Sequence, residues 1–351
     1  MSFAQTLDGG GVERALLRLA GLWVAGGRRV TIVIGSDKGP LADEMPTGVE
    51  IIRLDDARYP TLARAAPGIV RALRPDVIFC PGNHYSAVAA WTKLRLGRGC
   101  PPIVGKVSNA LVRDDMGWAA MGYAAWLRLH PRFLDAVVAM TPGMAAEAKR
   151  AMRIAPERVR VIANPPALRR DGAAHPAMPT GRYLIGVGRL APQKRWDRAI
   201  AALARIGDPA IVLVILGEGE MREALAVQAA ALGVGGRVIL PGHALDPLPA
   251  IGGAALLLLT SDYEGVPGVL REALAMGTPV VATDSSVAVR EIVTRPDQGS
   301  IVPRDDPDAL VAAIEQWLEP GRARPAPVVA AGDPAAIYTE LFDSLASSSA
   351  A

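Results

Sequence analysis

Two acidic residues with the spacing of a ligand site, Glu264 and Glu272, stand eight positions apart in SDYEGVPGVLREALAMGTPVVAT, residues 261–283. An apolar run precedes this segment, and Pro267 has a preset φ that suits a first helical turn, so we expect strand, tight loop and helix in succession. The start of a helix attracts anions, above all phosphate. The backbone positions expected to face the anion are Gly265, Val266, Gly268 and Val269.

Carboxylates beside an anion site need a reason, because they repel phosphate. They fit if they face the neutral, hydroxyl-rich ends of one ligand, with Glu264 directed to a sugar and Glu272 to a ribose. A nucleotide sugar has this layout. Two solvated surface charges would be the commoner meaning of such a pair standing alone.

Cations suited to a diphosphate occur in VGRLAPQKR, where Gly188, Arg189 and Lys194 follow an apolar run. Cleavage of a nucleotide sugar leaves negative charge on the diphosphate, which oriented cations and dipoles stabilise. Arginine offers a planar fork of donors and lysine a mobile point charge. Together with a helix dipole they can carry the phosphate charge, so we expect neither a metal ion nor another cofactor.

The E-x7-E from Glu264 to Glu272, combined with the G-R-x4-K from Gly188 to Lys194, resembles the signature of the retaining glycosyltransferases of family four. Residues 181–303 are similar to that family's nucleotide-binding domain in order and spacing. The resemblance implies the two-domain GT-B fold, retention of anomeric configuration, and catalytic roles for Glu264, Arg189 and Lys194. It also implies front-face attack, in which the departing diphosphate oxygen helps to deprotonate the acceptor hydroxyl while Glu264 holds sugar hydroxyls.

Three further segments extend the resemblance to the nucleotide. Gly217 in ILGEGEM and the strand end at Leu240 in VILPGH would line the nucleotide pocket, with the Leu240 backbone at the base edge. The glycine-rich turn of GGGVER, including Gly10 and Gly11, resembles the element that faces the donor phosphates in the family. UDP is the expected nucleotide, although one backbone contact suits guanine as well as uracil.

The sequence departs from the family on the sugar side of the first domain. Many members carry a His after the strand that matches residues 103–107, where this chain reads Lys106-Val107-Ser108-Asn109-Ala110. Ser108 or Asn109 could hydrogen-bond a sugar hydroxyl instead. His84, in GNHYS, could contact the acceptor, or its segment could cap a helix. The first strand is expected to be short, since about seven residues precede the glycines.

Strand-like and helical segments alternate along the chain. This predicts an α/β protein with two Rossmann-like, doubly wound parallel sheets that face each other across a cleft. The expected parts are an acceptor-side domain over 1–166, a linker over 167–181, a nucleotide-sugar-binding domain over 182–325, and a crossover helix with a tail over 326–351. The last helix is expected to return to the first domain, and the final ASSSAA to be disordered.

Composition limits the setting of the protein. Half of the 351 residues are apolar, enough for two cores. No apolar run approaches the ~18 residues of a membrane helix, and no signal pattern opens the chain, so we expect a cytoplasmic location. Cys80 and Cys100 have no metal-type spacing, and two cysteines do not suggest a disulfide framework.

The charge is divided unequally between the two halves. Residues 1–170 carry 24 Lys and Arg against 14 Asp and Glu, a net charge of +10, while residues 171–351 carry 14 against 21, a net charge of −7. A basic half attracts an anionic partner, such as a membrane surface or a pyrophosphate-linked lipid, although a solvated surface explains it as well. No motif indicates nucleic-acid binding.

A stripe of basic and aromatic residues between Trp118 and Phe133 fits contact with the inner face of a membrane, although such a stripe is more often a core stripe with a solvated face. Basic residues that add to the membrane interpretation are Lys93, Arg95, Arg98 and Arg113.

The leading hypothesis is a glycosyltransferase that moves a sugar from a nucleotide-sugar donor to a glycan or a lipid-pyrophosphate-linked glycan. A non-catalytic nucleotide-sugar-binding protein is the first alternative, because the first strand is short and the usual His is missing. A Rossmann oxidoreductase is disfavoured, since GGGVER and GEGEMR both lack the full G-x-G-x-x-G and no acidic residue follows at the ribose-binding distance.

Overall fold

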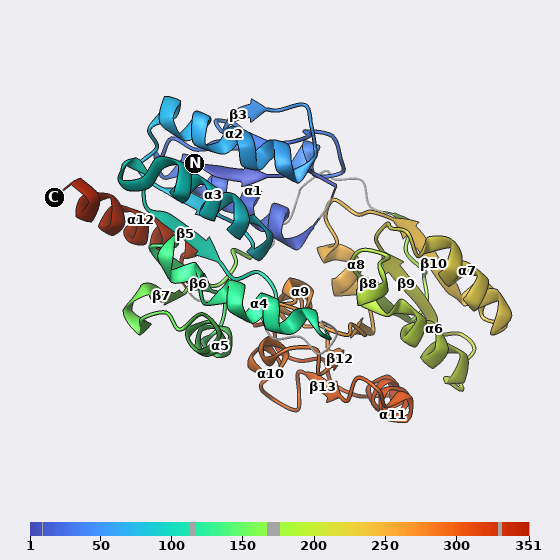
Figure 1. Ribbon diagram of the computed structural model, residues 1–351. Coiled ribbons are helices and arrows are strands. Elements are labelled where there is room, and N and C mark those ends of the chain that lie inside the picture. Colours follow the sequence, from blue (N-terminus) through green and yellow to red (C-terminus); the bar gives the residue numbers. More distant parts are fainter. Residues whose placement is uncertain (9, 112–116, 167–175, 329–331, 351) are drawn as a thin grey trace. The chain divides into compact units, whose positions relative to one another are not determined.

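The chain folds into two compact units, shown in the computed structural model of Figure 1. The structure describes residues 1–8, 10–111, 117–166, 176–328 and 332–350. The first unit contains Met1–Pro165 together with Gly332–Ala351, and the second contains Pro166–Ala331. Of the predicted linker, 167–175 lie outside the described residues, as do Gly9 and Arg113.

The first unit is built on a seven-stranded parallel sheet with the order β3-β2-β1-β4-β5-β6-β7. Its strands are β1 (Ser2–Ala4), β2 (Thr31–Ile34), β3 (Glu50–Arg53), β4 (Ile78–Cys80), β5 (Ile103–Lys106), β6 (Ala136–Ala139) and β7 (Val159–Val161). The first strand is short, as predicted, yet it lies inside the sheet, because Ser2 is paired with Ile32 on one side and with Phe79 on the other.

Helices connect these strands. They are α1 (Gly11–Ala25), α2 (Tyr59–Leu73), α3 (Ser86–Leu96), α4 (Ala119–Leu127) and α5 (Pro142–Met152). In α1, Leu16, Leu17, Ala20 and Trp23 recur at helical spacing, and all four are buried against the sheet. Gly10 is its N-cap residue, so the glycine-rich turn ends at the helix start, as expected.

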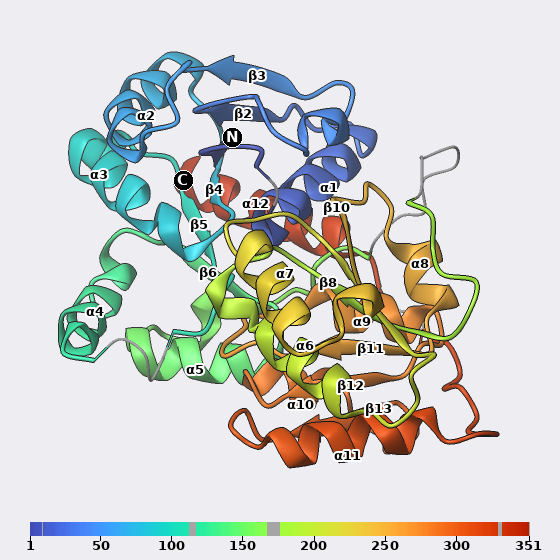
Figure 2. The ribbon, with the colours of Figure 1, turned by 90° about the vertical axis from the view of Figure 1, so that its right-hand side faces the viewer.

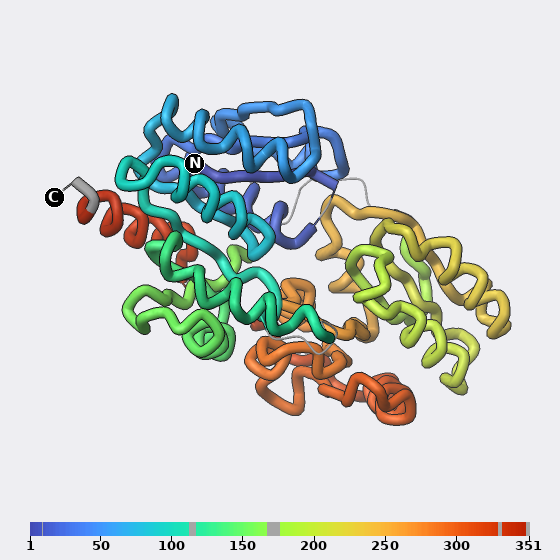
Figure 3. Tube along the Cα trace, in the orientation of Figure 1, coloured from blue at the N-terminus to red at the C-terminus, as the bar shows by residue number. Residues whose placement is uncertain are grey.

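The last helix, α12 (Pro334–Ala350), belongs to the first unit, which confirms the predicted return of the chain (Figures 1 and 3). Tyr338 is fully buried, and its ring packs edge-on against Trp23 of α1 with 5.6 Å between centroids. The expectation of a disordered tail is wrong. The helix continues through the serines, where Ser347 and Ser348 donate hydrogen bonds to the carbonyls four residues earlier.

The second unit contains a six-stranded parallel sheet with the order β10-β9-β8-β11-β12-β13 (Figure 2). Its strands are β8 (Tyr183–Val187), β9 (Val212–Leu216), β10 (Val238–Gly242), β11 (Leu256–Leu259), β12 (Val280–Thr283) and β13 (Gly299–Val302). The order reverses between β8 and β11, which are paired directly, with Leu184 opposite Leu256. Ligands of doubly wound sheets bind beyond the carboxyl ends of the strands at such a reversal.

Helices cover this sheet and close two apolar cores, one on each face. They are α6 (Trp196–Arg205), α7 (Arg222–Ala231), α8 (Leu248–Gly253), α9 (Gly268–Ala275), α10 (Val287–Ile292) and α11 (Pro307–Leu318). The sequence did not predict α8 and α10. Each has six residues, fewer than two turns, so neither provides enough sequence for a helical period to be recognised.

Candidate active site

The reversal between β8 and β11 brings the two charged motifs together. Lys194 lies in a 3₁₀ turn (Pro192–Lys194) after β8, and Glu264 lies in the loop after β11. Lys194 Nζ donates a hydrogen bond of 2.6 Å to Glu264 Oε1, and the hydroxyl of Ser261 donates to the same oxygen, also at 2.6 Å. The side chain of Lys194 is 16% exposed and that of Glu264 is 9% exposed, so this ion pair is largely removed from water.

Backbone and side-chain hydrogen bonds fasten the two loops to each other. The amide of Asp262 donates to the carbonyl of Gln193 at 2.9 Å, and the side-chain amide of Gln193 donates to the carbonyl of Tyr263 at 2.7 Å. The hydroxyl of Thr260 donates to the carbonyl of Lys194 at 3.0 Å. These bonds hold Lys194 beside Glu264.

A second group of charges supports the turn from its far side. Arg195 has a φ of +48°, in the left-handed region that a non-glycine residue adopts only at a cost. Its guanidinium pairs with Asp197 at 2.8 Å and with Asp262 at 3.3 Å, and Arg198 pairs with Asp262 at 2.7 Å. The hydrogen bonds to Asp197 raise the pKa of Arg195. Neither this network nor the roles of Gln193 and Ser261 were predicted from the sequence. Their positions next to Lys194 and Glu264 were the only signal available.

Arg189 is placed differently from Lys194. Its backbone is held, since the indole N–H of Trp196 donates to its carbonyl at 3.0 Å. Its side chain is exposed, and within the described part of the chain its guanidinium makes no hydrogen bond or ion pair. An arginine on a fixed backbone with free donors is suited to an incoming anion.

The glycines of the second unit have a packing role that the sequence did not reveal. A Cβ on Gly217 would lie 2.0 Å from the carbonyl oxygen of Gly188, and one on Gly219 would lie 2.5 Å from that of Leu190. Both glycines also have positive φ values, of +159° and +156°. They are therefore required where the loop after β9 crosses the loop after β8, whether or not a ligand approaches them.

The helix α9 begins one residue later than expected. Pro267 is its N-cap residue rather than part of the first turn, so the amides of Gly268 and Val269 lie in that turn and the amide of Val266 precedes it. Gly265 is tied back to the next loop, since its carbonyl accepts a hydrogen bond of 2.9 Å from Ser286. Glu272 lies half-buried in the second turn of the helix, as the sequence predicted.

The strand end at Leu240 is already engaged. The guanidinium of Arg222 donates to the Leu240 carbonyl at 3.0 Å, and the strand pairing skips Leu240, passing from Ile239 to Gly242. A base edge at this position would share that carbonyl with Arg222.

The corresponding edge of the first unit lies at the ends of β1 and β4, where its strand order reverses. His84 follows β4, and its Nε2 lies 3.9 Å from Oε1 of Glu13 in the first turn of α1. The ring of His84 lies on that of Tyr85, with centroids 4.0 Å apart, and burial lowers the pKa of His84. A Cβ on Gly10 would come within 2.3 Å of the Glu13 carboxylate, whereas Gly11 faces open space. A role for Glu13 was not predicted from the sequence.

Ser108 and Asn109 are held by the protein itself. The hydroxyl of Ser108 accepts from the amide of Asn83 at 3.2 Å, and the amide of Ser108 donates to the side chain of Asn83 at 2.7 Å. The side-chain oxygen of Asn109 accepts from the amide of Ala110 at 2.9 Å. A role for either residue in binding a sugar would need these bonds to be shared or exchanged.

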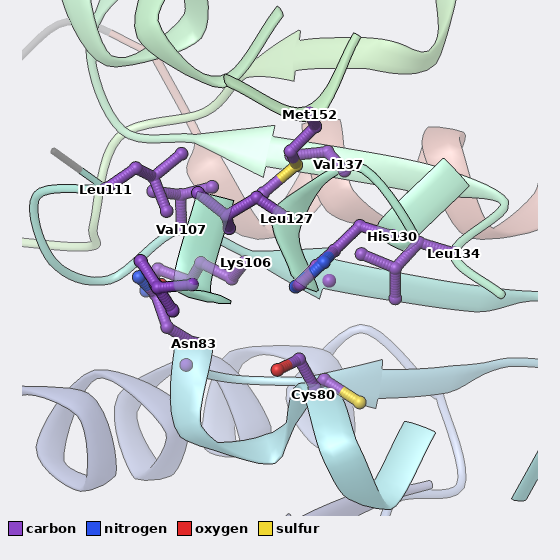
Figure 4. A pocket seen from close by; sticks show the side chains of 14 residues that line it. Cys80, Asn83, Lys106, Val107, Leu111, Leu127, His130, Leu134, Val137 and Met152 are labelled. Atoms are coloured by element: carbon purple, nitrogen blue, oxygen red, sulfur yellow. The ribbon is translucent and has the colours of Figure 1, made fainter. Parts of the chain in front are cut away.

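A small pocket of about 20 Å³ lies near this edge, between β4, β5 and α4 (Figure 4). Lys106 is buried beside it, with its ammonium 2.5 Å from the side-chain oxygen of Asn164 and no carboxylate partner among the described residues. Burial lowers the pKa of Lys106 to about 7. A space of this size holds about one water molecule, so Lys106 belongs to the interior of the unit.

The part of the chain that the structure describes has no group of three or more His, Cys, Asp or Glu side chains that could hold a metal ion. Asp306 and Asp308 flank Pro307 in an Asp-x-Asp pattern, but both carboxylates bond within the protein. Asp306 caps α11 by accepting from the amide of Ala309 at 2.9 Å, and Asp308 pairs with Arg205 at 2.6 Å.

The aromatic stripe between Trp118 and Phe133 divides into two parts. Trp126, His130 and Phe133 pack on one another, with His130 buried, so this part belongs to the core. Trp118 and Met121 are instead 91% and 80% exposed. None of the described helices is both long and apolar enough to span a membrane.

Two family models match the chain, one for each unit. A model described as "Glycosyl transferase 4-like domain" matches residues 10–165, and one described as "Glycosyl transferases group 1" matches residues 171–327. The chain therefore belongs to the family-four glycosyltransferases, and its two parallel-sheet units are the two domains of the GT-B fold. This membership removes the oxidoreductase alternative.

Curated relatives are similar over part of their length. The lipopolysaccharide core biosynthesis glycosyltransferase LpsE of Rhizobium meliloti is 32% identical over 190 residues, which is 53% of this chain and 54% of the relative. A GDP-mannose-dependent alpha-mannosyltransferase of Mycobacterium tuberculosis is 27% identical over 320 residues, 81% of this chain and 79% of the relative. The match to LpsE thus spans about half of that protein.

Solved structures share the fold. The Anabaena protein HepE in complex with UDP-glucose superimposes with a TM-score of 0.71 at 20% identity, covering 99% of this chain and 97% of the other. At this identity the likeness supports the fold and leaves the substrate open.

Proposed function

We propose that the chain transfers a sugar from a nucleotide-sugar donor to a hydroxyl group of a glycan or a lipid-pyrophosphate-linked glycan, with retention of anomeric configuration. The observation that carries this proposal is the contact of Lys194 with Glu264 at the reversal of the second sheet, 2.6 Å between charged atoms from two different loops. Membership of a glycosyltransferase family supports it.

The proposed roles follow from charge and exposure. Arg189, exposed and without a partner among the described residues, and Lys194 bind the donor diphosphate, with the amides of Gly268 and Val269 at the start of α9. Glu264 accepts hydrogen bonds from sugar hydroxyls, and Glu272 binds the ribose. Because cations and helix amides carry the phosphate charge, the proposed reaction uses no metal ion.

The proposed chemical step is a front-face displacement. The bond between the anomeric carbon and the diphosphate oxygen breaks, the acceptor oxygen bonds to that carbon on the same face, and the acceptor proton passes to the departing diphosphate oxygen. Glu264 forms no covalent bond in this scheme. A glycosyl–Glu264 adduct trapped during turnover would refute it.

UDP is the proposed nucleotide, supported by the fold similarity to a UDP-glucose complex, while a GDP-mannose-dependent relative keeps GDP as the competing choice. The relation to a lipopolysaccharide core enzyme supports a glycan or glycolipid acceptor.

We place the reaction in the cytoplasm, at the inner face of a membrane that the basic first unit contacts. The exposure of Trp118 and Met121 supports this contact.

The alternative, a protein that binds nucleotide sugars without turnover, keeps one observation in its favour. The family His is missing, and the residues in its place, Ser108 and Asn109, are already hydrogen-bonded within the protein. For a transferase, we propose that His84, which lies beside Glu13, contacts the acceptor in place of these two residues.

A thermal-shift screen of UDP- and GDP-sugars, followed by a transfer assay with the donor that binds, tests the proposal. A ligand at one hundred times its Kd stabilises the folded state by about 2.7 kcal/mol, enough to rank the donors. Transfer that is lost in Lys194→Ala and Glu272→Ala supports an enzyme. Donor binding without turnover over a broad acceptor panel supports the binding protein, and no binding of any nucleotide sugar contradicts both.

A further inference from the structure

A groove on the outer surface of the first unit, between α2 and α3, has the character of a second binding site. Its volume is about 290 Å³, close to the lower end of the range for small-molecule pockets. The residues that line it are Arg64, Pro67, Gly68, Arg71, Trp91 and Arg95. The two helices lie side by side in both ribbon views (Figures 1 and 2).

The charge of the groove is uncompensated. None of Arg64, Arg71 and Arg95 forms an ion pair or a hydrogen bond with any residue that the structure describes. Residues 57–113 contain nine Lys and Arg but a single acidic residue, Asp76. Arginines elsewhere in the same unit do have carboxylate partners, such as Arg28 with Asp343 and Arg53 with Asp37, both at 2.6 Å. Three like charges around one groove repel one another unless an anion lies between them.

The walls of the groove are shaped as well as charged. The guanidinium of Arg95 lies 5.5 Å from the ring centre of Trp91, a cation–π arrangement that holds it over the groove. Trp91 itself is 40% exposed. On the α2 side, a Cβ added to Gly68 would meet no atom within 4 Å, so the space above Gly68 is open.

Helix dipoles explain only part of this arrangement. Arg71 and Arg95 lie in the last turns of α2 and α3, where a cation is favourable for any helix. Arg64 lies in the first half of α2 and gains nothing from that dipole, yet it faces the same groove. The last turns also lie towards the amino-terminal edge of the parallel sheet, away from the edge where His84 follows β4.

We propose that this groove binds a phosphate group together with the small polar group that carries it. Arginine forks match phosphate oxygens two at a time, and three of them around about 290 Å³ leave room for a phosphate ester rather than for a bare ion. The phosphate comes either from the headgroup of an anionic lipid or from a free phosphate ester. The site is separate from the sugar-transfer site and does not depend on transfer activity.

Two changes in the 351-residue chain test the proposal by different means. Gly68→Leu fills the open space without changing the charge and replaces a poor helix former by a good one, so the fold is expected to hold. The pair Arg71→Gln and Arg95→Gln removes two charges and leaves the shape. A matched control, Arg29→Gln with Arg150→Gln, removes two charges from exposed arginines of the same unit that lie outside the groove.

One arm measures binding to phosphatidylcholine vesicles with and without phosphatidylglycerol, and the other measures binding of glycerol phosphate by calorimetry. We expect Gly68→Leu and the Arg71/Arg95 pair each to weaken phosphate binding about tenfold or more, and the control to change it less than threefold. A loss confined to vesicles identifies a lipid headgroup, and a loss of glycerol phosphate binding identifies a soluble ester. If Gly68→Leu binds both probes like the wild type, or the Arg71/Arg95 pair is no weaker than the control, the proposal is wrong.

Discussion

The buried pair of Lys194 and Glu264 makes a quantitative prediction about stability. Glu264 is 9% exposed, and its Oε1 receives two donors, the ammonium of Lys194 and the hydroxyl of Ser261, each at 2.6 Å. Lys194→Met removes the only one of these donors that carries a charge. The carboxylate then remains in a site that was built for a cation.

The expected cost follows from the burial of the two partners. Removing one member of a buried ion pair costs about 3–5 kcal/mol, because the other charge stays desolvated. Since Lys194 keeps some exposure, we expect Lys194→Met to lower the free energy of unfolding by about 3 kcal/mol, at the lower end of this range. Glu264→Gln should lower it by about 2 kcal/mol, because the ammonium of Lys194, left without its carboxylate, can reach water. The double variant should lose about 3 kcal/mol rather than 5, which is a coupling of about 2 kcal/mol.

The assay is urea unfolding of the four proteins, followed by circular dichroism and by tryptophan fluorescence. Trp196, fully buried next to the turn that carries Lys194, reports on the second unit. Additive losses in the double variant would show that the two side chains do not interact in solution, and the geometry of the proposed site would then be wrong.

Three further changes test other parts of the account. Lys106→Met should keep the fold. In the wild type, burial lowers the pKa of Lys106 from 10.5 to about 7. Between these two pH values the unfolded chain therefore keeps a proton on Lys106 that the folded protein has released. Urea unfolding between pH 7.5 and 9 should therefore show the free energy of unfolding of the wild type rising with pH, relative to that of Lys106→Met, by up to about 1.4 kcal/mol per pH unit. If the free energies of unfolding of the two proteins run parallel with pH, Lys106 is not buried as described. Gly217→Ala places a Cβ 2.0 Å from the Gly188 carbonyl oxygen and should lower the free energy of unfolding by about 3 kcal/mol or more. The melting temperature should therefore fall even without nucleotide. An unchanged melting temperature would mean that the glycine is needed for the approach of a ligand and not for packing. Arg189→Gln should change the free energy of unfolding by no more than about 0.5 kcal/mol, because the Arg189 side chain is exposed and without a partner among the described residues. In calorimetry the same variant should bind the donor about tenfold more weakly. Equal donor affinity would show that Arg189 does not belong to the site.

Much of the fold could be predicted from sequence, because the buried strands of parallel sheets are short apolar runs bounded by turns. Leu256–Leu259 is such a run, and its strand was expected. Helices of six residues, such as α8, have too few residues to show a period. The tail was misjudged because serine is a poor helix former, while in the structure Ser347 and Ser348 bond to the preceding turn of a helix that begins on the first unit's core.

The site was predictable only as far as motif residues and strand order allow. Glu264 and Lys194 were expected to share one ligand, and the adjacency of β8 and β11 does bring them into contact. Ser261 and Gln193, which hold them there, have no spacing of their own that would mark them. Gly217 was interpreted as a ligand-facing residue because its conflict with Gly188 comes from a loop nearly thirty residues away in sequence.

The central claim is that Lys194 and Glu264 bind an activated sugar, and titration calorimetry of the best-binding nucleotide sugar tests it most directly. The wild type, Lys194→Met and Glu264→Gln are compared with Arg205→Gln, which breaks an exposed ion pair in the same unit and leaves the two loops untouched. The account predicts that Lys194→Met and Glu264→Gln weaken binding about tenfold or more, since a hydrogen bond to a charged group contributes about 1.5–3 kcal/mol, while Arg205→Gln binds like the wild type. Equal affinities in all four proteins would contradict it.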